Sequence, residues 1–230
     1  MLTPLAVQTL GLRPYAEVWA LQKELQSKRK EQAIGDTLIL CQHSPVITAG
    51  TSAKKTNILI DQTELKARGV DFFEIERGGD VTFHGPGQLV AYPIMDLNQK
   101  HRDVHWYMRT LEEVILRVLA HFQVAGSRFP GRTGVWIQGA DNVIEFGPKP
   151  RKIASIGVRI SRWCTMHGAA LNVTDQSAGF SLIHPCGFQD IEVTSMATER
   201  ERVGAVAQLD LHEVEAVFAS EFAEVFQCLK

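Results

Sequence analysis

Residues 77–88 read Arg77-Gly78-Gly79-Asp80-Val81-Thr82-Phe83-His84-Gly85-Pro86-Gly87-Gln88, and they lie between two apolar runs, 71–76 and 89–95, that are typical of strands. The stretch contains four glycines and one proline. Its backbone is therefore expected to turn sharply and to approach another group closely, because glycine enters positive φ without steric cost. The glycines are interleaved with polar and ionisable side chains, which a plain connector does not need. A loop that forms a functional site is the favoured interpretation, and a simple connector between two strands is the alternative.

The composition is that of an ordinary globular protein. Of the 230 residues, 45% are hydrophobic and 22% are charged, and such proportions give no sign of disorder. A chain of this length buries about 70% of its unfolded surface, and we expect residues 1–230 to form one domain. The 24 basic and 26 acidic residues leave a net charge of −2, which provides no general attraction for nucleic acid. The chemistry of particular side chains must therefore identify the partner.

The cysteines Cys41, Cys164, Cys186 and Cys228 are widely separated and form no Cys-x-x-Cys pair. Their spacing indicates neither a zinc site nor a redox motif, so no metal is expected. No apolar run approaches the ~20 residues of a membrane span, and the first residues lack the basic and apolar regions of a secretion signal. We expect a cytoplasmic protein that does not bind a membrane.

Helical and extended patterns are mixed along the chain. The 3.6-residue periodicity of amphipathic helices occurs at 15–31, 103–124 and 210–229, and capping boxes at Asp61 with Glu64 and at Asp210 with Glu213 mark helix starts. Strands are predicted at 37–41, 71–76, 89–95, 152–160 and 164–173, and a hairpin is predicted from 135–137 and 143–146. Because hairpins and helices do not alternate strictly, we predict an α/β (α+β) fold, in which helices flank a mixed, mostly antiparallel sheet.

A short echo links two parts of the chain, because Thr82-Phe83-His84-Gly85 and Thr165-Met166-His167-Gly168 share the form Thr-x-His-Gly. Chance is one explanation of a four-residue echo. The other is that His84 and His167 lie on opposite sides of one pocket.

Lys152 and Cys186 are the candidates for chemistry. Lys152 begins a predicted strand and shares a face with Ala154, Ile156 and Val158, where it either extends to water or is held partly buried. Cys186 lies between Pro185 and Gly187 in a predicted loop, where a substrate can approach its sulfur. A lone cysteine is more often inert core, but the loop favours a nucleophile, and a nearby ammonium such as that of Lys152 would help to form the thiolate.

Four sequence blocks follow in order along the chain: residues 77–88 with the later Tyr92-Pro93, then Lys152-Ile153-Ala154-Ser155-Ile156-Gly157, then His167-Gly168-Ala169-Ala170-Leu171-Asn172, then Pro185-Cys186-Gly187. In every block the sequence resembles the lipoyl(octanoyl) transferase family. One block alone would be a weak signal, whereas four in order are a strong one. The resemblance implies a fold like the catalytic domain of biotin and lipoate protein ligases, and it implies no cofactor.

The resemblance also implies a reaction and its partners. An octanoyl group would pass from octanoyl-acyl carrier protein to a specific lysine of lipoyl domains, which occur in the E2 subunits of 2-oxoacid dehydrogenases and in the glycine cleavage H protein. Because the carrier protein in this family is acidic, docking is expected to use local basic residues, drawn from Lys149, Arg151, Arg159 and Arg162.

The resemblance assigns roles to particular residues. Cys186 matches the cysteine that accepts the acyl group as a thioester, and Lys152 matches the lysine that activates it. The segments that match the lining of the acyl pocket are Arg77, Gly78, Gly79, Asp80, Val81, Thr82, Phe83 and His84, then Ser155, Ile156 and Gly157, and then Gly168, Ala169 and Ala170. Val81, Phe83 and Ala169 are expected in the pocket wall.

Two positions depart from the family pattern. Trp163 stands where a small residue, often glycine, is usual, and His184 stands where asparagine is common before Pro-Cys-Gly. Neither change removes a reacting group. The alternative functions are an ATP-dependent lipoate or biotin protein ligase, whose chemistry needs no cysteine, and a catalytically silent acyl-binding module. The Pro-Cys-Gly context favours the transferase.

Overall fold

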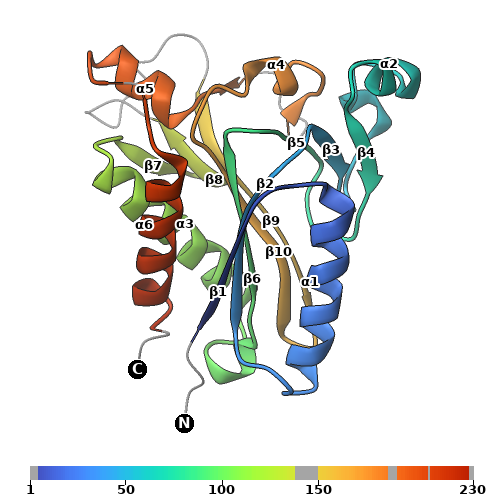
Figure 1. The fold of residues 1–230 in the computed structure, drawn as a ribbon, viewed down its shortest axis with the longest axis vertical. Helices are drawn as coiled ribbons and strands as arrows, with labels where there is room; N and C mark the ends of the chain where they lie inside the picture. Colours follow the sequence, from blue (N-terminus) through green and yellow to red (C-terminus); the bar gives the residue numbers. More distant parts are fainter. Residues whose placement is uncertain (1–4, 138–149, 186–190, 207, 228–230) are drawn as a thin grey trace.

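The main sheet is the central feature of the computed structural model, which describes residues 5–137, 150–185, 191–206 and 208–227 (Figure 1). Its strand order is β1-β2-β6-β10-β9-β8-β7, and β11 pairs with β9. The β1–β2 and β9–β11 pairs are parallel, and the other described pairs are antiparallel. The bounds are β1 Ala6–Arg13, β2 Thr37–His43, β6 Gln88–Ile94, β7 Gly126–Phe129, β8 Arg132–Ile137, β9 Arg151–Ser161, β10 Cys164–Asn172 and β11 Glu192–Val193.

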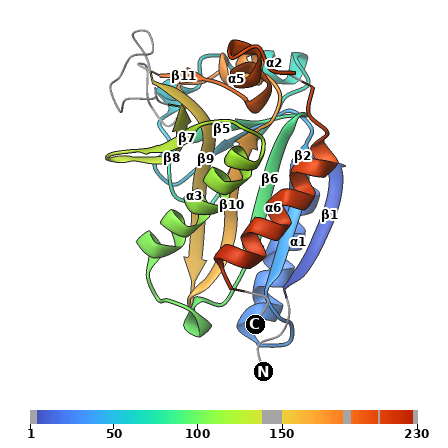
Figure 2. The same ribbon diagram turned by 90° about the vertical axis from the view of Figure 1, so that its left-hand side faces the viewer.

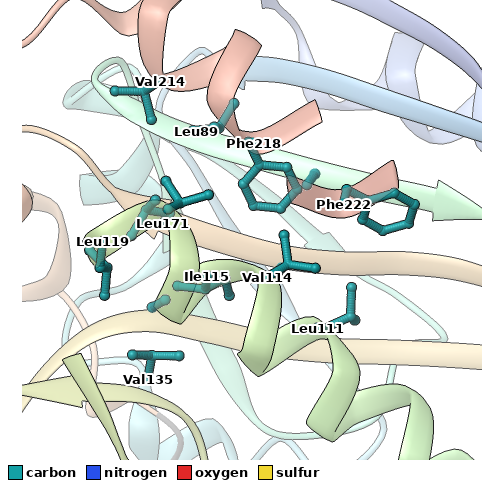
Figure 3. Packing of buried hydrophobic residues seen from close by; sticks show 14 of the residues in the cluster. Leu89, Leu111, Val114, Ile115, Leu119, Val135, Leu171, Val214, Phe218 and Phe222 are labelled. Atoms are coloured by element: carbon teal, nitrogen blue, oxygen red, sulfur yellow. The ribbon is translucent and has the colours of Figure 1, made fainter. Parts of the chain in front are cut away.

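Helices cover both faces of this sheet (Figures 1 and 2). On one face, Val18 and Leu25 of α1 (Tyr15–Lys30) pack on apolar side chains of β2, β6 and β10. On the other face, α3 (Val104–His121) and α6 (Leu211–Val225) pack on the sheet and on each other. Figure 3 shows Val114 of α3 next to Phe218 of α6. Leu111 lies on the side of Phe222 in the same view. Burial of these side chains, at about 25 cal/mol per Å² of apolar surface, supplies most of the stabilisation.

A second, smaller sheet of order β4-β3-β5 lies at one end of the molecule. It consists of β3 (Val46–Ala49), β4 (Asp71–Glu74) and β5 (Val81–His84). Its own apolar cluster includes Leu65 of α2 (Gln62–Ala67) and Phe180 of α4 (Ser177–Phe180). The remaining helical segments are the 3₁₀ turns η1 Lys55–Asn57 and η2 Leu97–Gln99 and the helix α5 Met196–Arg202.

Three helices begin at aspartate caps, and the caps at Asp61 and Asp210 were predicted from the sequence. The side chains of Asp61, Asp103 and Asp210 accept hydrogen bonds from backbone N–H groups in the first turns of α2, α3 and α6. Each cap satisfies a donor that has no partner within the helix. The predicted mixed, mostly antiparallel sheet flanked by helices is therefore confirmed. Among the described residues, no helix is long and apolar enough to cross a membrane.

Two local predictions need correction. Residues 77–88 do not form one loop, because Val81–His84 is strand β5 and pairs with β3, a strand that the sequence did not predict. Residues 135–137 belong to β8, which pairs with β7 on one side and β9 on the other. The predicted hairpin partner, 143–146, lies outside the described residues.

Candidate active site

A cavity lies where β5 of the small sheet faces β6, β9 and β10 of the main sheet. The cavity itself has a volume of about 50 Å³, and the wider hollow around it, which includes open solvent, amounts to about 490 Å³. Most of the predicted pocket residues line it, namely Arg77, Gly79, Asp80, Thr82, His84, Ser155, Ile156, Gly157, Gly168, Ala169 and Ala170. The structure adds Tyr15, Ile75, Val90, Tyr92 and His167. Of these, Tyr15, Ile75 and Val90 carry no polar or glycine signal that would have distinguished them from ordinary core residues.

Successive side chains of β5 point to opposite sides of the strand, so only some of the predicted residues 77–84 face the cavity. Thr82 and His84 face the cavity, whereas Val81 and Phe83 point the other way, into the apolar cluster of the small sheet. The Phe83 ring packs on Phe180, with ring centroids 5.9 Å apart. Gly78 is also absent from the lining. Val81 and Phe83, which were expected in the wall of the acyl pocket, thus do not line this cavity, whereas Ala169 does.

Arg77 ties the loop before β5 to the small sheet. Its guanidinium donates to the carbonyl oxygen of Thr48 at 2.7 Å and to the Thr48 hydroxyl at 3.2 Å. The next residue, Gly78, donates its backbone N–H to the carbonyl of Val158 in β9 at 2.9 Å. The loop therefore joins the two sheets at the cavity and places a positive charge in its wall.

A buried hydrogen-bond chain fixes the orientation of His84. Asn172 Nδ2 donates to the carbonyl of Thr194 at 2.9 Å, so Asn172 Oδ1 is the acceptor for Gln88 Nε2, also at 2.9 Å. Gln88 Oε1 must then accept, and it lies 2.6 Å from His84 Nδ1. Because a backbone carbonyl can only accept, the chain assigns the proton to His84 Nδ1 and leaves a lone pair on Nε2.

The histidines around the cavity are neutral. The pKa of His84 is lowered to about 3, mainly by burial and to a smaller extent by the neighbouring His43. Burial also lowers the pKa of His167 to about 3, with a smaller contribution from the positive charge of Arg77. His84 and His167 both line the cavity, which confirms that the echoed histidines share one pocket.

His167 has a strained backbone. Its φ is +58° in the middle of β10, a conformation that a residue with a side chain adopts at a cost of about 1 kcal/mol or more. Its backbone N–H donates to Gln22 Oε1 of α1 at 2.9 Å, which holds this conformation. Among the described residues, His167 Nε2 and the Thr82 hydroxyl are buried without a hydrogen-bond partner. The cavity thus presents polar atoms to a ligand.

Lys152 lies near the start of β9, three residues before Ser155 and hence about 10 Å from it along the strand. It is buried, with 4% of its surface exposed, so it does not extend to water. Its Nζ donates to the carbonyl of Thr133 at 3.2 Å and lies 4.9 Å from the centre of the Trp136 ring. Lys152 is not part of the cavity lining.

Cys186 lies outside the described residues, but the chain that leads to it is described. The backbone N–H of His184 donates to the carbonyl of Asn57 at 2.8 Å. The Asn57 amide donates to Asp80 Oδ2 at 2.6 Å, and Asp80 lines the cavity. The approach to Cys186 is therefore anchored to the cavity wall two residues before the sulfur.

The departure at Trp163 has a conformational meaning. Arg162 and Trp163 have φ values of +50° and +63° at the turn between β9 and β10. Two successive residues with positive φ are typical of a type I′ hairpin turn, in which glycine is favoured. The glycine usual in the family is thus a turn residue, and the tryptophan that replaces it is not among the residues that line the cavity.

Comparisons with known proteins agree with this architecture. Residues 14–223 match the family model for the lipoyl protein ligase A/B catalytic domain. The chain is 43% identical over 221 residues to an octanoyltransferase of Chloroflexus aurantiacus, a match that covers 94% of this chain and 95% of the relative. An octanoyltransferase of Rubrobacter xylanophilus is 44% identical over 217 residues, with 94% and 90% covered.

A solved structure shows the same fold. A bipartite lipoate protein ligase from Thermoplasma acidophilum matches with a TM-score of 0.68 at 18% identity, covering 99% of this chain and 84% of that one. The chain therefore belongs to the lipoyl protein ligase A/B catalytic-domain family. Within that family its relatives are octanoyltransferases, so it is an acyltransferase whose activity is octanoyl transfer in protein lipoylation. The predicted fold class and the prediction of octanoyl transfer in lipoylation are confirmed.

Proposed function

We propose that the chain carries out octanoyl transfer by double displacement through a thioester on Cys186. The observation that carries this proposal is the convergence of Arg77, the β9 segment 155–157 and the β10 segment 168–170 on one cavity. Lys152 lies buried in the same strand β9, and the chain leading to Cys186 is anchored at Asp80. Both sheets contribute to the cavity, which supports a single catalytic domain over residues 1–230.

The donor is octanoyl-acyl carrier protein. The Cys186 thiolate attacks the carbonyl carbon of the donor thioester, a bond forms between that carbon and the Cys186 sulfur, and the bond to the carrier sulfur breaks. The carrier leaves as a thiolate and takes up a proton. The ammonium of Lys152 favours the Cys186 thiolate electrostatically and is the near source of that proton.

The acceptor is a lysine of a lipoyl domain, in an E2 subunit of a 2-oxoacid dehydrogenase or in the glycine cleavage H protein. Its neutral amine attacks the thioester carbonyl, an amide forms, the amine loses a proton, and the Cys186 thiol is regenerated. No nucleotide is consumed, because the thioester already stores the energy of the amide bond.

The cavity is suited to an acyl chain along part of its wall. Val90, Tyr92, Ala169 and Ala170 provide apolar surface. At about 0.8 kcal/mol for each buried CH₂ group, an octanoyl chain contributes roughly 5 kcal/mol of binding. This is enough for the enzyme to discriminate between chain lengths.

The donor protein is acidic, so docking needs exposed positive charge. Arg151 cannot contribute, because it is buried and pairs with Glu199 through two hydrogen bonds of 2.9 Å. Lys149 lies outside the described residues. Arg159 and Arg162 are exposed. Burial is the main cause that lowers the pKa of Lys30 in α1; Cys164 opposes it, and the charges of Arg162 and Arg159 lower the pKa further. We therefore place the docking patch at Arg159, Arg162 and Lys30.

The covalent intermediate is the test. After incubation with octanoyl-acyl carrier protein and no acceptor, intact mass should rise by one octanoyl group, hydroxylamine should release it, and peptide mapping should find it on Cys186. Apo lipoyl domain should discharge it without ATP. Cys186→Ser should lose the label, whereas Cys41→Ser, at a buried thiol in β2, should keep it. Transfer that requires ATP, or that persists in Cys186→Ala, refutes the proposal.

A further inference from the structure

The peptide group between Thr133 and Gly134 lies between two buried charged side chains. Its carbonyl oxygen accepts a hydrogen bond from Lys152 Nζ at 3.2 Å. Its N–H donates to Glu112 Oε1 at 3.0 Å. The C=O and N–H of a trans peptide point in opposite directions, so a single peptide joins the carboxylate of α3 to the ammonium of β9.

Glu112 is buried, with 1% of its surface exposed. Its other oxygen, Oε2, accepts from the guanidinium of Arg109 at 2.6 Å and from Arg128 Nε at 3.2 Å. A buried carboxylate is costly unless it is paired and hydrogen-bonded. Here the two arginines hold Oε2, and the backbone of β8 holds Oε1.

Gly134 gives this peptide its orientation. Its φ is +108°, and a Cβ atom there would lie 2.5 Å from the carbonyl oxygen of Ala154 and 3.1 Å from Lys152 Cε. Any side chain would therefore collide with β9 and displace the lysine. The lack of a side chain lets Lys152 approach the peptide closely, and the left-handed φ turns the N–H toward Glu112.

We propose that Glu112 is a positioning residue for Lys152, acting through the peptide of Thr133 and Gly134. This proposal rests on the proposed role of Lys152 in octanoyl transfer. A carboxylate that accepts from the N–H polarises the peptide and makes its carbonyl a stronger acceptor, as in other hydrogen-bond chains at low dielectric. The carbonyl then holds the ammonium in one place, beside the face of Trp136. Removal of the Glu112 charge should loosen Lys152 and weaken its effect on Cys186.

Glu112→Gln is the informative change because it keeps the shape. Glutamine has a single side-chain oxygen, which the guanidinium groups of Arg109 and Arg128 attract. Its NH₂ group would then face the N–H of Gly134, and the bond to the peptide would be lost. Glu113→Gln is the matched control, since Glu113 is the next residue of α3 and also pairs with Arg128, at 2.8 Å, and its hydrogen bonds among the described residues go to Arg117 and Arg128 and not to β8.

The measurement is the alkylation rate of Cys186 against pH, followed by peptide mapping, because it needs no catalytic turnover and can be made with Lys152→Ala. We expect Glu112→Gln to slow alkylation at pH 7 about fivefold and to move the profile to higher pH, with Glu113→Gln unchanged. In the Lys152→Ala background, Glu112→Gln should have almost no further effect, because two residues that act through one group are not additive.

If Glu112→Gln slows Cys186 alkylation by the same factor in the wild type and in Lys152→Ala, the proposal is overturned, because Glu112 would then not act through Lys152. The proposal is also overturned if folded Glu112→Gln shows the same dependence of alkylation rate on pH as the wild type. A wild-type profile in Lys152→Ala instead refutes the activating role of Lys152, whatever Glu112→Gln does. If Glu112→Gln does not fold, Glu112→Asp replaces it, since aspartate keeps the charge toward the arginines but is one methylene too short for the Gly134 N–H, and the same outcomes decide.

Discussion

Acid should destabilise this protein through the buried histidines around its cavity. The folded-state pKa is about 4 for His43 and about 3 for both His84 and His167, against 6.5 for an exposed histidine, and burial is the largest cause in each case. The folded protein therefore keeps the histidines neutral, whereas the unfolded chain takes up protons as the pH falls below 6.5. Stability from this source is complete above that pH and is lost as the pH falls toward 4.

The size of the effect follows from these values. Between pH 7 and pH 5, each of the three histidines removes about 2 kcal/mol from the free energy of unfolding, and together they remove roughly 6 kcal/mol. A typical domain has only about 5–15 kcal/mol of stability. The loss is thus large enough to bring the protein close to unfolding at pH 5, although no residue in the chemical step has changed.

Urea unfolding curves at several pH values between 8 and 5 measure this loss. His84→Gln should lower stability at pH 8, because it disturbs the hydrogen-bond chain to Gln88. Between pH 7 and pH 5, however, the free energy of unfolding of His84→Gln should fall by about 2 kcal/mol less than that of the wild type. His105→Gln is the control, because His105 is exposed on α3. If the free energy of unfolding falls by the same amount in the wild type and in His84→Gln between pH 7 and pH 5, burial of His84 is not a cause of the loss.

Three further results are expected. Gly168→Val should destabilise the protein by at least about 2 kcal/mol, since a Cβ there would lie 2.1 Å from a carbonyl oxygen of the adjacent strand β6; an unchanged urea midpoint would contradict this. Arg151→Ala should cost about 3 kcal/mol, because the buried Glu199 carboxylate would keep only the Thr194 hydroxyl and Arg202, whose Nε lies 3.7 Å away; the same urea curves measure it, and a loss below about 1 kcal/mol would be inconsistent with it. Reversing the docking charge with Arg159→Glu and Arg162→Glu should raise KM for octanoyl-acyl carrier protein about tenfold at low salt and little at high salt; a KM that does not change with salt or charge would remove this patch.

The helices and the mostly antiparallel sheet could be predicted because their signals are local. Periodicity predicts α1, α3 and α6, and the carboxylate caps at Asp61, Asp103 and Asp210 act within one turn of the helices that they begin. The glycine-rich stretch 77–88 predicted a site because its signal is also local. Positive φ and a close backbone approach impose glycine at the position concerned, whatever the rest of the fold does.

The small sheet could not be predicted in the same way. Strand β5 lies in a stretch rich in glycine and polar residues, and it becomes a strand only because β3, more than thirty residues earlier, offers its backbone for pairing. The same pairing decides that Thr82 and His84 face the cavity while Val81 and Phe83 face away. The sequence motif alone does not tell which of its residues face the cavity, because the two sides of a strand can be assigned only when its neighbouring strands are known.

The sequence by itself determined the family, the glycine-rich stretch and the polar groups available for chemistry, because these depend on residue identity and order. Only the tertiary structure decided which of them meet. The neutral state of His84 depends on burial, and the position of its proton depends on a hydrogen-bond chain through Gln88 and Asn172 to the carbonyl of Thr194. The contact of Glu112 with the peptide that holds Lys152 joins α3, β8 and β9. Hydrogen bonds and desolvation act over a few ångströms in space, and the chain brings such distant residues together only when it folds.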